Sequence, residues 1–198
     1  SGFNAIFSGL AFRYLLWVCS IVAVFSLLQA TPLFGYTIDV DFQYQDRTYD
    51  ATGFTGTQYL PIRFADVEVW GATAIITTGG TDANGRFSAT VADSATTQNI
   101  TIKCYTSSKD YSTYPVAIYN NATSKALYSI STVTNNHNAS QNIDQTGASA
   151  IQTTTSEFGG PFNILDRYID GYQYITTNTL LNTSIASVAD VSVFWENN

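Results

Sequence analysis

Carboxylate side chains offer the first chemistry to consider, because several of them are closely spaced. Asp39 and Asp41 alternate along one predicted strand, and Asp46 and Asp50 follow them. Paired carboxylates can bind calcium or act as general acid and base. We favour a simpler interpretation, a solvated strand face whose charges discourage edge pairing with other chains.

A second acidic segment, residues 82–85 (Asp-Ala-Asn-Gly), has the beginning of a calcium-binding loop. It lacks the remaining ligands and the distal Glu of such a loop. Residues of these types commonly join two antiparallel strands. We therefore predict a hairpin turn at this place.

The chain has one histidine, His137, which limits the reactions that depend on an imidazole. Zinc hydrolases generally use about three protein ligands that include histidine. A Ser-His-acid triad would need the same His137, and no Gly-x-Ser-x-Gly motif accompanies it. Because His137 stands in an Asn-rich stretch, we expect a solvated loop histidine. The sequence thus predicts a protein that is not an enzyme, with no catalytic, cofactor-binding or metal-binding residues and no cofactor.

The two cysteines are expected to be buried free thiols. Cys19 lies in an apolar run and Cys104 in a predicted strand. If the run forms a separate helix, the two sulfur atoms cannot approach within disulfide distance in one protomer.

Tyrosines and asparagines leave carbohydrate open as a partner. The tyrosines of a loop-rich region, Tyr111, Tyr114 and Tyr119, can form a sugar-binding face, and core packing or fibre contacts explain them equally well. Four asparagines begin an Asn-x-Ser/Thr sequon and are candidate glycosylation sites of a glycoprotein: Asn99, Asn121, Asn138 and Asn182.

The composition favours a folded, acidic body whose surface is mostly uncharged. Of the 198 residues, 45% are hydrophobic and 12% are charged, and the net charge is −7. The polar surface must therefore consist mainly of hydroxyl and amide side chains, which favour strands and turns. The eight basic residues are scattered along the chain, so a nucleic-acid partner is not expected.

The first part of the chain is apolar, and Arg13 is the only charged residue before Asp39. We predict one continuous helix from Phe3 to Ala30 within a segment of residues 1–35. The alternatives are a membrane anchor, a helix buried among copies of itself in a filament core, and a secretory signal cleaved near Ala30. The segment weakly resembles that of bacterial type IV pilins, although it has no acidic residue near its start.

Alternating apolar residues predict that the body is mainly β. The period of two is clearest at residues 37–44, 65–70, 86–91 and 99–105, and a β-branched run occupies residues 74–78. In the first of these, Ile38, Val40, Phe42 and Tyr44 share one face. Residues 46–58 are expected to form a loop, because they contain glycines and lack this alternation. We predict an antiparallel sandwich, transthyretin-like or Ig-like, over residues 36–106.

Three of these segments resemble one known family. The strand Ala-Asp-Val-Glu-Val-Trp (65–70), the turn Thr-Asp-Ala-Asn-Gly-Arg-Phe (81–87) and the strand Ile-Thr-Ile (100–102) are similar to the carboxypeptidase regulatory-like domain. The resemblance covers about residues 37–106. It implies a small transthyretin-like sandwich of the kind carried as an accessory module by secreted enzymes and surface proteins.

The remaining residues, 107–198, are expected to form a second β-rich portion. Strands are predicted at 116–119, 126–133 and 191–195, and residues 135–152 are predicted to form a long polar loop. An amphipathic helix is predicted at 161–176, with Pro161 in its first turn. This helical stretch weakly resembles the segment before the zinc site of some secreted metallopeptidases, whose His-Glu-x-x-His motif is absent here.

Taken together, the sequence predicts an extracellular structural protein at the cell surface. The favoured function is a pilus-like filament subunit that assembles with copies of itself through the N-terminal helix. The alternatives are the non-catalytic N-terminal part of a membrane-anchored secreted metallopeptidase and a glycan-binding surface adhesin.

Overall fold

The computed structural model describes residues 35–92, 97–138, 140–153, 156–178 and 190–196 of the chain. The chain divides into two units, residues 1–34 and residues 35–198. The predicted helix at Phe3–Ala30, with Arg13 and Cys19, lies outside the described residues. The following description concerns the second unit, which we call the body.

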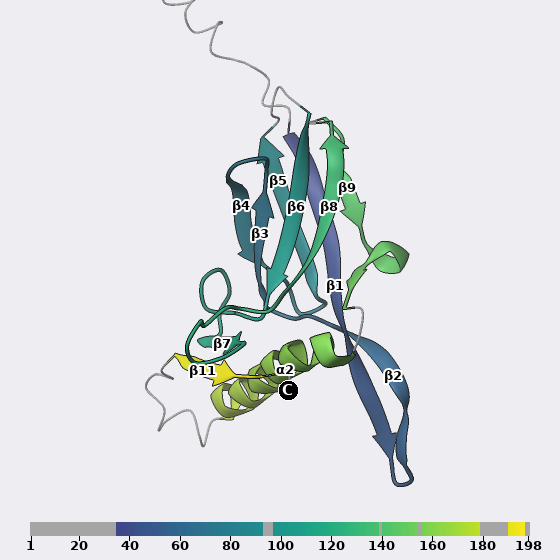
Figure 1. The fold of residues 1–198 in the computed structure, drawn as a ribbon, viewed down its shortest axis with the longest axis vertical. Coiled ribbons are helices and arrows are strands. Elements are labelled where there is room, and N and C mark those ends of the chain that lie inside the picture. The colour runs from purple at the N-terminus through teal and green to yellow at the C-terminus, as the bar shows by residue number, and fades with distance from the viewer. Residues whose placement is uncertain (1–34, 93–96, 139, 154–155, 179–189, 197–198) are drawn as a thin grey trace, which may run out of the picture. The chain divides into compact units, whose positions relative to one another are not determined.

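The body is mainly β and contains a sandwich of two sheets (Figure 1). One sheet is antiparallel, has four strands and the order β4-β3-β6-β8. Its strands are β3 (Asp66–Trp70), β4 (Ile75–Gly80), β6 (Gln98–Tyr105) and β8 (Ser129–His137). Two of them, β3 and β6, coincide with segments whose alternation predicts strands, and β4 and β8 overlap the strands predicted at 74–78 and 126–133.

The other sheet is organised around the long strand β1 (Gly35–Asp50). The first half of β1 pairs with β5 (Arg86–Ala92) on one side and with β9 (Ile143–Gln145) on the other. The second half pairs with β2 (Gly53–Pro61) and β10 (Ile151–Gln152). The pairings with β9 and β10 are parallel and those with β2 and β5 are antiparallel.

The core lies between the two sheets and continues beneath a helix. The predicted inner face of β1 is confirmed, because Ile38, Val40, Phe42 and Tyr44 are all fully buried. The same cluster includes the predicted inward residues of the other strands: Val67, Val69, Phe87, Ile100, Ile102 and Cys104. Cys104 is a buried free thiol, as predicted, and burial raises its pKa well above the usual value.

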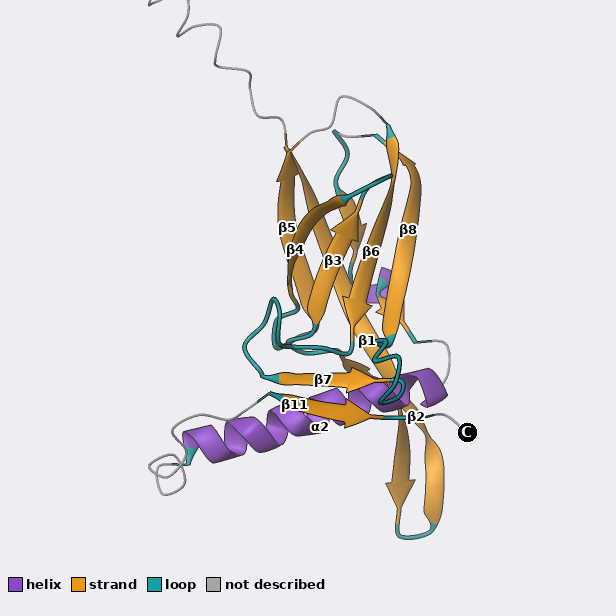
Figure 2. Cartoon of the chain, turned by 60° about the vertical axis from the view of Figure 1, so that its left-hand side comes forward, coloured by secondary structure: helices purple, strands orange, loops and turns teal. Residues whose placement is uncertain are grey.

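A long helix, α2 (Ser156–Thr177), covers one end of the sandwich beside two short strands (Figure 2). Phe162, Leu165 and Ile169 of α2 are buried in the common core, so the predicted apolar face is confirmed. The strands β7 (Val116–Tyr119) and β11 (Val191–Phe194) form a parallel two-stranded sheet. Among the described residues, no helix is both long and apolar enough to cross a membrane.

Several predicted boundaries are wrong. Helix α2 begins at Ser156, so Pro161 lies beyond the first turn that the sequence suggests. Residues 46–58 are not a loop, because they form a hairpin of β1 and β2. The predicted loop at 135–152 contains the end of β8, the strands β9 and β10, and the short 3-10 helix η1 (Gly147–Ser149).

The predicted division at residue 106 does not separate two folded parts. Strand β8 completes the sheet that contains β6, and β9 and β10 complete the sheet around β1. Residues 35–198 accordingly form one compact unit. The sandwich predicted for residues 36–106 needs strands that follow residue 106.

Candidate functional site

A polar cluster centred on the buried carboxylate of Asp166 joins α2 to the sandwich. Arg63, between β2 and β3, donates hydrogen bonds to Asp166 (2.5 Å) and Asp170 (2.6 Å). The other carboxylate oxygen of Asp166 accepts hydrogen bonds from Tyr44 (3.1 Å) and Arg167 (2.9 Å). Burial, reinforced by the Asp166 carboxylate, raises the pKa of Tyr44. Because both oxygens of Asp166 are occupied, the cluster acts as a clamp between α2 and β1.

A second buried carboxylate, Asp66, organises the loop after β6. Its oxygen atoms accept hydrogen bonds from the Ser107 hydroxyl (2.5 Å) and from the backbone amides of Lys109 (3.1 Å), Asp110 (3.2 Å) and Tyr111 (2.9 Å). Four donors satisfy the charge of a carboxylate that is nearly inaccessible to water. Asp66 therefore fixes a loop and does not face a substrate-sized space.

The carboxylates of β1 each have a partner within the fold. Asp39 accepts a hydrogen bond from Ser88 (2.6 Å) and pairs with Arg86 (3.1 Å). The Ser88 hydrogen bond lowers the pKa of Asp39, and Arg86 lowers it further, against a smaller opposing effect of burial. Asp41 accepts a hydrogen bond from the backbone amide of Gly147 (2.8 Å).

The next two acidic residues are separated from this pair along β1. Asp46 accepts a hydrogen bond from Asn163 of α2 (2.6 Å), and Asp50 caps the hairpin turn through Thr52 (2.7 Å). Over the part of the chain that the structure describes, no group of three or more His, Cys, Asp or Glu side chains is placed to hold a metal ion.

A turn is present at 82–85, but the predicted hairpin is wrong, because this turn connects β4 of one sheet to β5 of the other. The Asp82 carboxylate accepts hydrogen bonds from the amides of Asn84 (2.8 Å) and Arg86 (2.9 Å). Gly85 has a φ of 77°, and a Cβ there would lie 2.6 Å from the carbonyl oxygen of Phe42. The oxygen atoms that a calcium loop would direct at a metal are used by the turn itself.

The prediction for His137 is wrong, because this residue is the last of strand β8 and only 5% exposed. Its ring contacts Tyr36 with 4.7 Å between the centroids. Its Nε2 atom is buried and has no hydrogen-bond partner within the described part of the chain, and burial lowers the pKa of the imidazole. The neighbouring asparagines gave a polar pattern that concealed a buried strand end.

The three tyrosines proposed as a sugar-binding face do not lie together. Tyr114 is buried against Phe64 and Tyr172, with ring centroids 5.1 and 5.3 Å away. Tyr119 stacks on Phe194, and Tyr111 is exposed.

The candidate glycosylation sites occupy different surfaces. Asn99 of β6 and Asn138 after β8 are exposed, whereas Asn121 is half-buried and organises a turn through its carbonyl oxygen. Asn182 lies outside the described residues.

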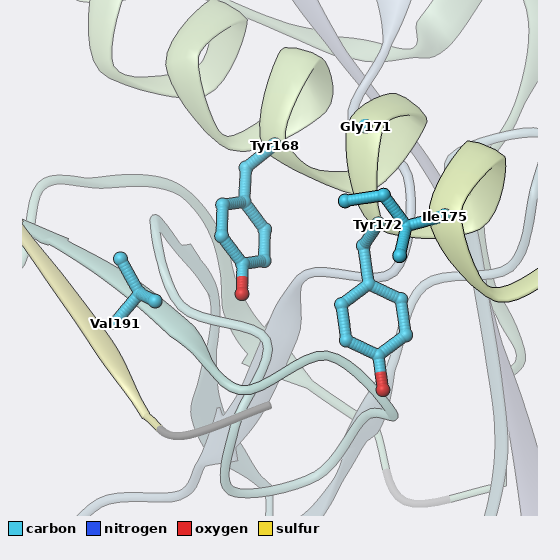
Figure 3. A pocket seen from close by; sticks show the side chains of 5 residues that line it. All are labelled: Tyr168, Gly171, Tyr172, Ile175 and Val191. Atoms are coloured by element: carbon cyan, nitrogen blue, oxygen red, sulfur yellow. The ribbon is translucent and has the colours of Figure 1, made fainter. Parts of the chain in front are cut away.

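A cavity not anticipated from the sequence lies against the C-terminal half of α2 (Figure 3). Its volume is about 270 Å³, and it is lined by Tyr168, Gly171, Tyr172, Ile175 and Val191. The lining is almost entirely apolar. The Tyr168 hydroxyl is buried and has no hydrogen-bond partner among the residues that the structure describes. We call this cavity the α2 pocket.

A second unanticipated feature is the hairpin formed by the end of β1 and the start of β2, which we call the arm (residues 46–58). It projects from the body beside α2 (Figure 1). Tyr49 and Phe54 near its turn are 63% and 60% exposed and contact each other edge to face, with centroids 5.8 Å apart. Their spacing as cross-strand partners could have been recognised only if residues 46–58 were assigned to a hairpin.

Comparisons with protein families, with curated proteins and with solved structures found no significant match to the chain.

Proposed function

We propose that this chain is a non-catalytic structural protein of the cell surface, a filament subunit that assembles through its apolar N-terminal segment. The observation that carries the proposal is the division of the chain. The body, residues 35–198, is a compact unit with a hydrophobic core of its own. In this proposal the body folds around its own core, and the apolar run of residues 14–30 is the part of the chain that contacts other copies.

The polar residues of the body support a structural function. The buried carboxylates Asp66 and Asp166 are saturated by hydrogen bonds that fix a loop and a helix. The one histidine is buried away from them at the end of β8. In this proposal these groups stabilise the fold.

Solubility supports assembly. An exposed apolar segment of this length far exceeds the few hundred Å² of contiguous apolar surface that soluble monomers tolerate. Copies of the same segment can cover one another, with the acidic bodies outside. In such an arrangement Arg13 meets an oxygen atom of a neighbouring subunit, because a cation in an apolar environment needs a partner.

Electron microscopy of four purified proteins tests this function. The full chain should form filaments, whereas Arg13→Glu and the separate body at micromolar concentration should not. Lys125→Glu is the matched control, because Lys125 is an exposed residue of the body, and it should still form filaments. Filaments of the same repeat made by the body alone would show that the N-terminal segment is not the assembly element.

One observation favours a second candidate, the non-catalytic front of a secreted metallopeptidase. The sheet of β7 and β11 is parallel and has only two strands among the described residues, whereas parallel sheets are usually larger and covered. Further strands beside β11 would complete a layer over α2. A reading frame that continues past Asn198 into a His-Glu-x-x-His motif would favour this candidate over the filament.

A further inference from the structure

We propose that the arm of one copy docks its aromatic tip into the α2 pocket of a second copy, so that the bodies associate head to tail. This contact deepens the proposed function, because it would order neighbouring bodies along a filament. It is nevertheless a property of the body and can be tested without the N-terminal segment.

The arm supplies an apolar group that its own body leaves uncovered. Tyr49 and Phe54 are directly opposed in the β1–β2 pairing and lie one position from the turn. The turn is fixed by hydrogen bonds from Thr52 to the Asp50 carboxylate. Two large rings held on a rigid hairpin lose little conformational entropy on binding, which makes them effective anchors.

The α2 pocket supplies a complementary space. At about 30 Å³ per molecule in liquid water, its 270 Å³ equals the volume of about nine waters, enough for one aromatic ring. Tyr168 and Tyr172 offer ring surfaces, and a Cβ added at Gly171 would meet no atom within 4 Å.

The arm cannot fill the pocket of its own body. Its base is held at the N-terminal half of α2, where Asn163 contacts Asp46. Gly171 lies eight residues further along the helix, about 12 Å at about 1.5 Å per residue. The arm extends away from the C-terminal half of α2 (Figure 1). The arm that inserts and the pocket that receives it are thus different surfaces of the body. Repeated pairing between copies therefore gives an open chain.

Charge does not drive this contact. Asp46, Arg47 and Asp50 lie on the arm, and Asp190, which precedes Val191 at the pocket, pairs with Lys109 at 3.9 Å. Charges of both signs thus lie on each surface, and association should persist at high salt, where they are screened. One ring in one pocket makes an interface below the usual size for stable complexes. We therefore expect weak association, with a dissociation constant roughly in the high micromolar to millimolar range.

Sedimentation velocity of the body tests the proposal, since residues 35–198 form a compact unit with their own core. The body should associate as its concentration rises. The arm variant Y49S/F54S and the pocket-filling variant Gly171→Leu should each weaken association at least tenfold. Ile75→Ser removes an exposed apolar residue elsewhere and should leave association unchanged. Circular dichroism confirms that each variant is folded.

Mixing the two defective variants is the decisive measurement. Y49S/F54S retains an open pocket and Gly171→Leu retains an intact arm, so the mixture should form one-to-one dimers and nothing larger. The proposal is overturned if the body stays monomeric at millimolar concentration, if either variant associates normally, or if the mixture forms no dimer. It is also overturned if the arm instead binds phosphatidylcholine vesicles, with binding lost in Y49S/F54S and kept in Gly171→Leu. If bodies associate as expected while the full chain forms no filaments, the proposed function fails and the contact stands.

Discussion

Single residues in this protein show how far burial changes the meaning of a polar side chain. Asp66, Asp166 and His137 are among the least exposed residues of the body. The sequence drew attention to Asp39 and Asp41 instead, because their spacing is visible without knowledge of the fold. Asp166 has Tyr44 and Arg63 as partners, and both are more than 100 residues away from it along the chain. Such a cluster is created by tertiary packing and has no local signature.

The stability of the body should depend on pH through His137. Burial lowers the pKa of His137 in the folded state, whereas the unfolded imidazole has a pKa of about 6.5. Between these two values the unfolded state binds more protons, so stability falls as the pH is lowered below about 6.5 and levels off below the folded pKa. Urea unfolding of the body, followed between pH 5 and 7.5, should show this loss.

A His137→Phe variant provides the control for this pH dependence. Phenylalanine keeps a ring against Tyr36 and removes the buried nitrogen that has no partner. The variant should lose the pH dependence between 5 and 7.5 and be at least as stable as the parent at pH 7. Hydrogen bonds lower the pKa values of Asp39 and Asp50, so these carboxylates change the stability of the body only at more acidic pH. If the variant keeps the pH dependence of the parent, groups other than His137 cause that dependence.

At the scale of elements, the alternation of apolar residues predicts the strands that bury one whole face. It fails for the strands that do not bury such a face. The strands with clear alternation, such as β1, β3, β5 and β6, are confirmed because one face of each lies in the core. The arm was missed because it has no buried face to impose alternation. Strands β9 and β10 were missed because they are two or three residues long and pair in parallel with a distant strand.

The two candidate sites of the body depend on contacts between elements that sequence analysis could not predict. The α2 pocket needs the contact between α2 and β11, and the arm needs the β1–β2 hairpin to continue past residue 46. Helix α2 itself was predicted from its apolar face. Its neighbour in space could not be predicted, because β11 reaches it only by pairing with β7.

Two glycines of α2 should respond oppositely to alanine. A Cβ at Gly159 would overlap the backbone of Gln45 in β1, whereas a Cβ at Gly171 would meet nothing within 4 Å. Gly171→Ala should stabilise the body by up to about 1 kcal/mol, the difference in helix propensity. Gly159→Ala should destabilise it by about 1–3 kcal/mol, because α2 must move away from β1.

Chemical denaturation of both variants measures this difference, and their common helix makes each the control of the other. Equal stabilisation by the two alanines would mean that α2 does not approach β1 closely at Gly159. In that case α2 would lie too far from the sandwich for the 2.5 Å contact between Arg63 and Asp166.

At the scale of the molecule, the chain closes its sandwich late. Strand β6 ends at Tyr105, but its outer edge is covered only by β8, which begins at Ser129. The first half of β1 is likewise covered by β9, more than 90 residues after it ends. Non-local pairing of this kind gives a cooperative unit whose parts do not fold separately.

This late closure makes a prediction about fragments, which also tests the expectation that residues 36–106 form a domain of their own. A fragment of residues 35–106 would expose the edges of β6 and β1 together with the buried side chains that α2 covers, among them Tyr44. Unpaired strand edges beside exposed apolar surface favour aggregation over folding. We expect this fragment to be unfolded or aggregated, whereas residues 35–198 unfold in one cooperative transition. Circular dichroism and tryptophan fluorescence should give coincident transitions for the longer protein only. A soluble fragment 35–106 with a cooperative transition of its own would show that the later strands decorate a complete sandwich and do not complete it.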